Sequence, residues 1–296
     1  MPSFYIPEMF SEYFFWTPPV AIPFPNLGGV LVVLVLWWFW DMIRLAFASS
    51  VSGKVVIITG ASSGIGAETA ISYAKRGAIL VLAARRKRDL AAVAESCLGA
   101  GANSVHVCVT DVSREEDCTV LIQSTVEKFG AIDLLVLNAG VAHNFYCEQV
   151  VPRGLNFERY MSVNYYGAVY PTLCALPHLR DSNGGIVVVS SIFGLVPAGR
   201  LAFYSASKHA LLGFFGALRQ ELGGGVSVTV ACPGAIRTGM TTGGVADASN
   251  KVGRAGKNGG VDKGLMSYLM LDPQDCAERI FAAASLKRRT VLVPWW

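Results

Sequence analysis

Three side chains in the middle of the sequence have the types and spacing of a proton-transfer site. Tyr204 and Lys208 are four residues apart, so on a helix they lie on the same face. Ser191 lies thirteen residues before Tyr204, at the end of an apolar run typical of a strand. A free phenol has a pKa of about 10, and a nearby ammonium favours its ionised form. The three residues together predict one site that moves a proton, whereas Tyr204 and Lys208 alone would indicate only an ordinary helix pair.

Nearer the N-terminus, three glycines lie between a predicted strand and a predicted helix. The β-branched run 54–60 is typical of a buried parallel strand, and the helix is expected to end near Arg76. Gly60, Gly64 and Gly66 occupy the turn. Such a turn lets backbone N–H groups and a helix N-terminus approach a pyrophosphate without a Cβ in the way. Its place directly after a strand predicts a dinucleotide site.

The residues after the second predicted strand, 79–83, indicate which dinucleotide binds. In nucleotide-binding βαβ units an acidic residue near this point holds the ribose 2′-hydroxyl. This sequence instead has Arg85 and Arg86, and its first acid there is Asp89. A guanidinium can pair with a 2′-phosphate that a carboxylate would repel. The sequence therefore favours NADP(H), with NAD(H) as a second option and a solvated, basic helix start as the alternative interpretation.

Apolar strands alternate with helical segments over the rest of the chain. This order predicts an α/β fold with a doubly wound parallel sheet, whose ligands bind outside the carboxyl ends of the strands. The candidate residues at those ends are Gly60–Gly66, Ala84–Arg86, Asp111 as an adenine contact, Asn138–Gly140, Ser191 and Pro233–Thr238. Ser113 is predicted to cap the helix after Asp111. A long helix over 157–179 contains Asn164, and Pro171 is expected to kink it.

The first 50 residues differ in composition from the rest. No charged residue occurs between positions 13 and 40, and the second half of that stretch is continuously apolar. A helix over 26–47 would reach the roughly 20 apolar residues that a membrane span requires. Its three tryptophans, at positions 37, 38 and 40, fit an interfacial aromatic belt. We therefore predict a membrane anchor over 1–50 and a globular domain over 51–296.

Other arrangements of this anchor are consistent with the same residues. Four prolines between positions 18 and 25 suit a bent hairpin that lies in one leaflet rather than a span. The stretch could also pack on the globular domain or mediate dimerisation. If it spans, the acidic residues before it and the basic residues after it, Arg44 and Lys54, favour a cytosolic globular domain.

Overall composition argues against several other classes of function. The chain has 296 residues, a net charge of +4 and no dense basic face, so nucleic-acid binding is not expected. Its seven cysteines are scattered and lack C-x-x-C spacing, which argues against a disulfide framework. The four histidines lack metal-ligand spacing, so no metal site is predicted.

From about Lys54 to Val293 the chain resembles the short-chain dehydrogenase/reductases. The matching stretches, in the same order and spacing, are Thr59-Gly-Ala-Ser-Ser-Gly-Ile-Gly66, Asn138-Ala-Gly140, Asn164, Ser191, Tyr204-x-x-x-Lys208 and Pro233-Gly-x-Ile-x-Thr238. Within the family, the chain is most similar to the 11β-hydroxysteroid dehydrogenases and their plant relatives, the steroleosins, which also carry an N-terminal hydrophobic anchor. The resemblance implies a Rossmann fold with strand order 3-2-1-4-5-6-7.

The resemblance also implies a role for each matching residue. Tyr204 would be the general acid/base, Ser191 would hold the substrate oxygen, and Lys208 would bind the nicotinamide ribose and lower the pKa of Tyr204. Asn164 would place a water in a proton relay. The residues implied to surround the cofactor are Thr59, Gly60, Ser62, Ser63, Gly64, Ile65, Gly66, Arg85, Arg86, Asp111, Val112, Asn138, Ala139, Gly140, Tyr204, Lys208, Pro233, Gly234, Ile236 and Thr238.

We therefore expect an NADP-dependent oxidoreductase that interconverts a secondary alcohol and a ketone on a lipophilic substrate, with a steroid favoured. Alternatives are another lipid, such as a retinoid or fatty ketone, and a lipid-surface structural protein that retains the nucleotide fold. A homodimer at the endoplasmic reticulum or a lipid droplet is expected. Phe145, Tyr146, Phe193 and Phe203 suit a lipophilic ligand but equally suit core packing. The glycine-rich stretch 239–264 suits a mobile loop or a small lid.

Overall fold

The computed structural model describes residues 50–150, 156–242 and 270–293, together with Val32, Val35, Leu36 and Phe39. The chain divides into two compact units, Met1–Phe47 and Ala48–Trp296. The four described residues of the first unit are helical and exposed. The rest of the predicted anchor lies outside the described residues, as does most of the glycine-rich stretch 239–264. Among the residues described, no helix combines the length and the apolar character needed to cross a membrane.

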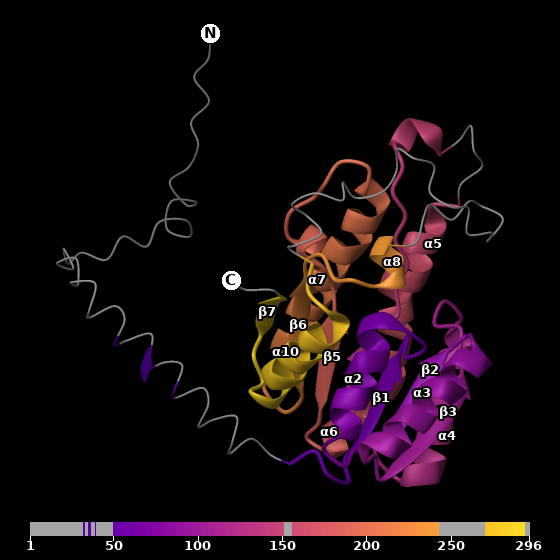
Figure 1. Ribbon diagram of the computed structural model, residues 1–296, viewed down its shortest axis with the longest axis vertical. Helices are drawn as coiled ribbons and strands as arrows, with labels where there is room; N and C mark the ends of the chain where they lie inside the picture. Colours follow the sequence, from indigo (N-terminus) through magenta and orange to yellow (C-terminus); the bar gives the residue numbers. More distant parts are fainter. Residues whose placement is uncertain are drawn as a thin grey trace. The chain divides into compact units, whose positions relative to one another are not determined.

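A parallel sheet forms the centre of the second unit (Figure 1). Its strands are β1 Val55–Thr59, β2 Ile79–Ala84, β3 Ser104–Val109, β4 Leu134–Leu137, β5 Gly185–Val189, β6 Ser227–Pro233 and β7 Thr290–Val293. Their order in the sheet is β3-β2-β1-β4-β5-β6-β7, which confirms the predicted order. The order reverses direction between β1 and β4, the place where doubly wound sheets bind ligands.

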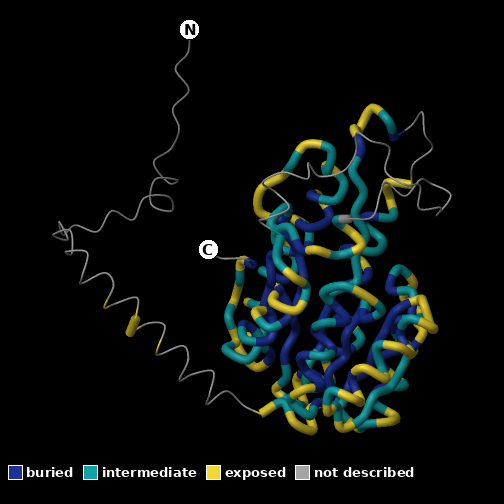
Figure 2. Tube along the Cα trace, viewed as in Figure 1, coloured by how far each residue is buried: buried dark blue, intermediate teal, exposed yellow. Residues whose placement is uncertain are grey.

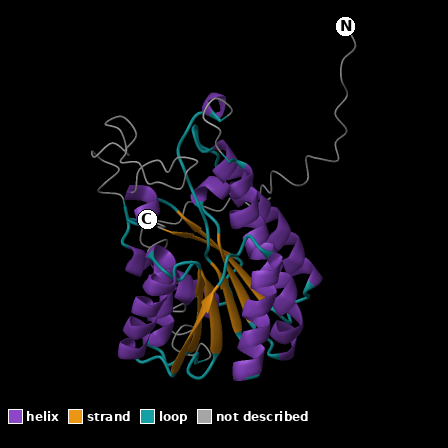
Figure 3. Cartoon of the chain, turned by 90° about the vertical axis from the view of Figure 1, so that its right-hand side faces the viewer, coloured by secondary structure: helices purple, strands orange, loops and turns teal. Residues whose placement is uncertain are grey.

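Helices cover both faces of this sheet (Figure 3). They are α2 Gly64–Ala74, α3 Lys87–Ala100, α4 Glu115–Phe129, α5 Glu158–Tyr160, α6 Gly167–Asp181, α7 Ala202–Glu221, α8 Gly239–Thr242 and α10 Pro273–Ser285. Two short 3₁₀ turns, η2 Cys147–Gln149 and η4 Ile192–Gly194, and one wider π-helical turn, η3 Met161–Tyr166, complete the helical elements of the described residues. The predicted α/β class is therefore confirmed in the described part of the chain.

The strands are mostly buried along their length (Figure 2), and the core consists of two clusters of buried side chains. One cluster joins the strands to α4, α6 and α7 through residues such as Leu121, Leu179 and Phe215. The other joins them to α2, α3 and α10 through Tyr73, Leu90 and Ile280. Strands covered on both faces need apolar residues at every position, which explains why the strand sequences are continuous apolar runs instead of alternating ones.

The long helix predicted over 157–179 is present but is not uniform. It consists of α5, the π-helical turn η3 and α6, and Asn164 lies buried in η3. The proline expected to kink this helix, Pro171, lies inside α6, and the irregular turn comes before it. Pro171 provides no N–H for the carbonyl of Gly167, and η3 ends immediately before Gly167. Wide turns of this kind are frequent at functional sites.

Candidate active site

The turn between β1 and α2 depends on glycines. Gly60 and Gly64 have φ angles of +66° and +58°, which side chains other than glycine rarely adopt. A Cβ on Gly60 would lie 2.7 Å from Ala139 Cα, and a Cβ on Gly64 would lie 3.2 Å from Thr238 Cγ2. The turn therefore lies against the loops that follow β4 and β6, and three of the predicted stretches meet here.

Thr59 and Asn138 hold this junction together. The backbone N–H groups of Asn138 and Ala139 donate to Thr59 Oγ1, at 3.0 and 3.2 Å. Asn138 Nδ2 donates to the carbonyl oxygens of Thr59, at 3.1 Å, and Gly60, at 3.2 Å. Both side chains thus bind the end of β4 to the glycine turn, so they fix the backbone of the predicted cofactor site.

Arg86 lies beside the start of α2. Its Nη2 donates to the hydroxyl oxygens of Ser62 and Ser63, both at 3.1 Å, and its Nε forms an ion pair with Asp89. The first turn of α2 contains no acidic residue. A guanidinium and a helix N-terminus both favour an anion, so we refer to Ser62, Ser63, Arg85 and Arg86 as the phosphate corner.

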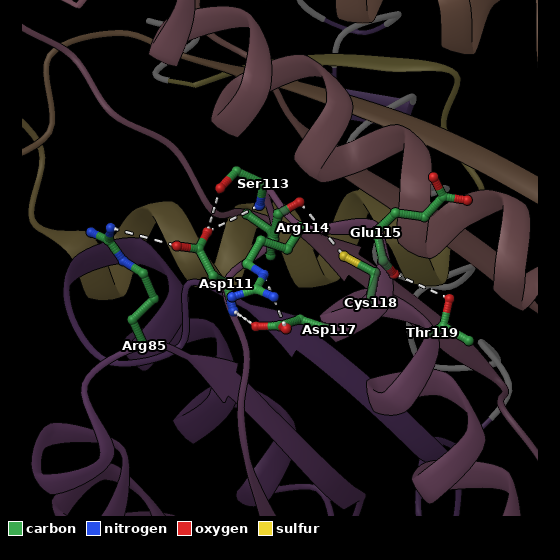
Figure 4. Close-up of polar contacts among 9 residues, drawn as sticks. Arg85, Asp111, Ser113, Arg114, Glu115, Asp117, Cys118 and Thr119 are labelled. Atoms are coloured by element: carbon green, nitrogen blue, oxygen red, sulfur yellow. Dashed lines mark hydrogen bonds and ion pairs between the residues drawn. The ribbon is translucent and has the colours of Figure 1, made fainter.

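Asp111 belongs to a network after β3 (Figure 4). The hydroxyl and the N–H of Ser113 donate to Asp111 Oδ1, at 2.7 and 3.0 Å. Arg85 Nη1 lies 3.9 Å from Asp111 Oδ2. Although its burial acts in the opposite direction, these hydrogen bonds, with the charges of Arg85 and Arg159, lower the pKa of Asp111. Asp111 is therefore a carboxylate at neutral pH.

The network also corrects the predicted helix cap. Arg114 and not Ser113 precedes α4, and no side chain caps that helix N-terminus. The Ser113 hydroxyl donates to Asp111, two residues away, and Asp117 Oδ2 accepts from the Asp111 N–H at 2.9 Å. The Ser113 hydroxyl therefore forms a local hydrogen bond to the Asp111 carboxylate instead of a capping bond to the helix. Val112 is buried against the start of α6, because a Cβ on Gly167 would lie 2.6 Å from Val112 Cγ2.

The predicted proton-transfer residues converge at the ends of β5 and α7. Ser191 directly precedes η4, accepts from the Phe193 N–H at 3.2 Å and donates to the Pro233 carbonyl at 3.4 Å. A side-chain hydrogen bond joins Ser191 to Tyr204. Lys208 Nζ is buried, donates to the Val189 carbonyl at 2.9 Å and lies 5.8 Å from the Tyr204 ring centre.

Asn164 connects these residues to the loop after β4. Its Oδ1 accepts from the Val141 N–H at 2.7 Å, and its Nδ2 donates to the Val141 carbonyl at 3.0 Å and to Ser207 Oγ at 2.9 Å. Ser207 in turn donates to the Tyr204 carbonyl at 2.7 Å. We refer to Asn164, Ser191, Tyr204 and Lys208 as the proton-transfer corner. A Cβ on Gly140 would contact both Asn164 and Lys208, so Gly140 borders this corner.

Burial changes the pKa of the two titratable groups in this corner. It raises the pKa of Tyr204, and the Ser191 hydrogen bond acts in the opposite direction. It lowers the pKa of Lys208 to about 8, against a smaller effect of Cys232. We expected Lys208 to lower the pKa of Tyr204. In the protein without cofactor, burial of the phenol instead raises this pKa. The proton thus resides on Tyr204 in this state.

The loops after β4 and β6 complete the surroundings. The Gly234 N–H donates to the Val293 carbonyl, and Ile236 pairs with Leu271, so the segment after β6 is fixed before it reaches Thr238. The structure thus brings together predicted residues from the ends of β1, β4, β5 and β6. Val141 and Ser207 were missed by sequence reasoning. The position of Ser207 could have been predicted, because it lies three residues after Tyr204 and on the same helix face.

No group of three or more histidine, cysteine, aspartate and glutamate side chains that could hold a metal ion occurs in the part of the chain that the structure describes.

Comparison with known proteins decides the family. Residues 54–248 match the family described as short chain dehydrogenase. This chain belongs to that family. As a short-chain dehydrogenase it is a nicotinamide-dependent oxidoreductase that acts on CH–OH groups, and the resemblance found in the sequence is confirmed.

Individual relatives agree with this assignment. An 11-beta-hydroxysteroid dehydrogenase of Pinus massoniana is 40% identical over 254 residues, which cover 86% of this chain and 70% of that protein. A short-chain dehydrogenase/reductase of Burkholderia phymatum in complex with NAD has a TM-score of 0.70 and 28% identity, covering 82% of this chain and 90% of that chain. An alcohol dehydrogenase of Thermococcus sibiricus complexed with 5-hydroxy-NADP has a TM-score of 0.67 and 26% identity, covering 82% and 96%.

Proposed function

We propose that this short-chain dehydrogenase interconverts a secondary alcohol and a ketone on a lipophilic, steroid-like substrate, with NADP(H) as its cofactor. The observation that carries the proposal is the proton-transfer corner, where a serine hydroxyl, a phenol and a buried ammonium lie together beside aromatic side chains. When bound, the cofactor supplies or accepts the hydride.

The side chains of the protein handle the proton. Ser191 and Tyr204 hold the substrate oxygen, and Tyr204 donates its proton to that oxygen in the direction of reduction and removes it in the direction of oxidation. Lys208 would bind the nicotinamide ribose, and its charge would favour the phenolate when the site needs a base. Asn164 positions the start of α7 through Ser207. It would also place a water in a proton relay.

The preference for NADP(H) rests on the phosphate corner. Arg86 already lies over the hydroxyl groups of Ser62 and Ser63, and Arg85 reaches toward Asp111 from the same end of β2. A 2′-phosphate at this position would meet two guanidinium groups, which bind phosphate oxygens with charge-assisted hydrogen bonds. NAD(H) lacks this phosphate and so gains no such bonds. Asp111 would lie near the adenine.

The substrate class rests on the side chains that surround Tyr204. Phe145, Tyr160 and Val150 form a buried cluster, against which Phe203 and Tyr204 pack. A flat apolar ring system would gain contact area against such side chains. The 11-beta-hydroxysteroid dehydrogenase name of the pine relative supports a steroid over other lipids.

Attachment and assembly are part of the same proposal. The apolar stretch within 1–50 would hold the enzyme at the endoplasmic reticulum or a lipid droplet, with the catalytic domain 51–296 in the cytosol. Val120 on α4 and Leu173 on α6 are exposed, although these helices pack together on one face of the sheet. Exposed apolar side chains on two helices that pack together suit an interface, so we propose a homodimer through α4 and α6.

A substrate panel tests the function. Steroids, retinoids and fatty ketones are offered to the full chain with NADP(H) and NAD(H), in both directions. The expected result is turnover of a steroid ketone or alcohol that is faster with NADP(H). Turnover of no compound by a chain that still binds NADPH would contradict the proposal and favour a lipid-surface structural protein.

A further inference from the structure

One polar pair interrupts the aromatic cluster beside Tyr204. His143 Nδ1 and the Tyr160 hydroxyl oxygen are 2.8 Å apart, and their rings lie edge to face at 5.8 Å. Tyr160 is buried, whereas His143 is partly exposed. None of the roles described above uses this pair.

The pair is close to the reacting group. Tyr160 stacks on Phe203 with ring centres 6.3 Å apart, and Phe203 directly precedes Tyr204. Tyr204 itself packs against the cluster that contains Tyr160 and Phe145. A substrate that reaches the Tyr204 hydroxyl with one end would lie beside this cluster, which contains Tyr160.

The loop that carries His143 is held on both sides. Two residues before it, Val141 forms both of its backbone hydrogen bonds with the Asn164 side chain. Two residues after it, the Phe145 N–H donates to the Arg200 carbonyl at 3.1 Å. The imidazole thus has a defined position relative to the proton-transfer corner, which a residue that selects substrates requires.

The direction of the hydrogen bond follows from the chemistry of the two groups. Burial raises the pKa of Tyr160, so its hydroxyl keeps the proton. Burial, and next the Arg159 charge, lower the pKa of His143, so its ring is neutral. A buried hydroxyl hydrogen needs an acceptor, and the imidazole nitrogen is the acceptor beside it. We therefore assign Tyr160 as the donor to Nδ1, with the ring proton on Nε2.

We propose that His143 is a specificity-determining residue, whose Nε2–H donates a hydrogen bond to a second oxygen of the substrate, remote from the reacting carbon. This inference rests on the proposed function, since it requires a lipophilic ketone or alcohol that reacts at Tyr204. Rings of the substrate lie against the aromatic side chains, and an oxygen placed among them would lose hydrogen bonding to water without a donor. His143 supplies that donor.

The kinetic test compares 5α-androstane-3,17-dione with the monoketones 5α-androstan-3-one and 5α-androstan-17-one, using full-length protein and NADPH. The wild type should prefer the dione by roughly three- to tenfold in kcat/KM, as expected for one hydrogen bond. His143→Phe should lose this preference, mainly through a higher KM for the dione. Equal losses for all three ketones, or an unchanged preference, would overturn the inference.

Further variants separate recognition from packing. In His143→Gln the amide oxygen can accept from Tyr160 while the amide N–H donates, so part of the preference should return. Tyr160→Phe should reduce the preference, because it removes the hydroxyl that fixes the ring proton. His209→Gln, on the exposed side of α7, should keep the wild-type ratio. A His143→Gln protein no better than His143→Phe would overturn a role as donor.

A spectroscopic test does not depend on turnover. Nitrogen NMR of protein labelled with 15N-histidine reports which ring nitrogen carries the proton, and His143→Gln identifies the signal. A proton on Nδ1 would overturn the inference. A wild type that reduces none of the three ketones would overturn the steroid assignment instead. The Nε2–H signal of His143 would then decide the inference. Decane-2,9-dione, which has a second oxygen, should shift this signal, whereas decan-2-one should not. Equal shifts with both ketones would overturn the inference.

Discussion

The proton-transfer corner and the phosphate corner differ in how their polar groups are held. In the first, Asn164, Ser191 and Lys208 are buried, and each has a backbone group as a hydrogen-bond partner. In the second, the side chains of Arg85 and Arg86 are 54% and 59% exposed, and their partners are other side chains. In the proposed function the two corners bind different parts of the cofactor and substrate, and their different surroundings should give them different tolerance to substitution.

The difference has a physical consequence. A buried polar group that loses its partner costs roughly 1–3 kcal/mol, so the proton-transfer corner cannot be altered without a loss of stability or rate. Exposed ion pairs contribute roughly 0–1 kcal/mol to stability, so the phosphate corner can change its charge at little cost to the fold. We therefore expect substitutions in the phosphate corner to change cofactor preference while leaving proton transfer unaffected.

The largest effect is expected for Tyr204→Phe. Loss of the hydroxyl removes proton transfer at the substrate oxygen, which lowers kcat by about 10²- to 10⁴-fold. Binding of NADPH, measured by fluorescence titration, should change little, because the ring remains. Near-normal turnover by this variant would show that Tyr204 is not the acid/base.

The pH dependence of stability tests the burial of Lys208. Its pKa is about 8 in the folded protein and 10.5 ordinarily, so the unfolded chain binds more protons between these values. Burial of the charged form therefore destabilises the fold below pH 8, and this cost is relieved as the pH rises toward 10.5. Relative to Lys208→Met, the wild type should gain up to about 3 kcal/mol across this window.

Urea unfolding of both proteins at pH 7.5 and at pH 10 measures this gain. Because the other titrating groups are common to the two proteins, they cancel in the difference. A difference that stays constant with pH would mean that Lys208 is not desolvated as its contacts imply.

Asn164→Ala tests whether the buried amide supports the corner. The substitution leaves the N–H and the carbonyl of Val141 without their partner, so the free energy of unfolding should fall by about 2–3 kcal/mol. Asn103→Ala, at an exposed asparagine, is the matched control and should change it by less than about 0.5 kcal/mol. Similar small losses in both variants would argue against the anchoring role.

The smallest of the four effects is expected at the phosphate corner. Arg86→Ala should weaken NADPH binding by about tenfold and leave NADH binding nearly unchanged, since a charged hydrogen bond to phosphate contributes roughly 1.5 kcal/mol or more. Arg85→Ala should have less effect, because its guanidinium reaches toward Asp111. The difference between variants should shrink at high salt. Equal weakening of both cofactors would remove the NADP assignment.

Much of the framework could be read from local sequence patterns. The β-branched runs predicted buried parallel strands, and the glycines after β1 predicted a turn between strand and helix, because both are properties of a few adjacent residues. The spacing of Tyr204 and Lys208 placed them on one helix face for the same reason. The strand order came from the family resemblance, and the sheet confirmed it.

Other features depend on contacts between segments distant in the sequence. Ser113 met the capping pattern, yet the carboxylate of Asp111 took its hydroxyl. Arg85 and Arg86 are adjacent and chemically equal in the sequence, but only the fold brings Arg86 to Ser62 and Ser63. A sequence pattern does not show which of several possible hydrogen-bond partners a side chain will meet in the folded protein.

By itself, the sequence determined the α/β class, the glycine turn and the shared helix face of Tyr204 and Lys208, since periodicity and backbone preference are local. Only the tertiary structure decided how these residues are held: the wide turn at Asn164, the lowered pKa of Lys208 and the pairing of His143 with Tyr160. The physical reason is that hydrogen-bond partners and desolvation are set by what packs around a group, and here those neighbours come from loops far apart along the chain.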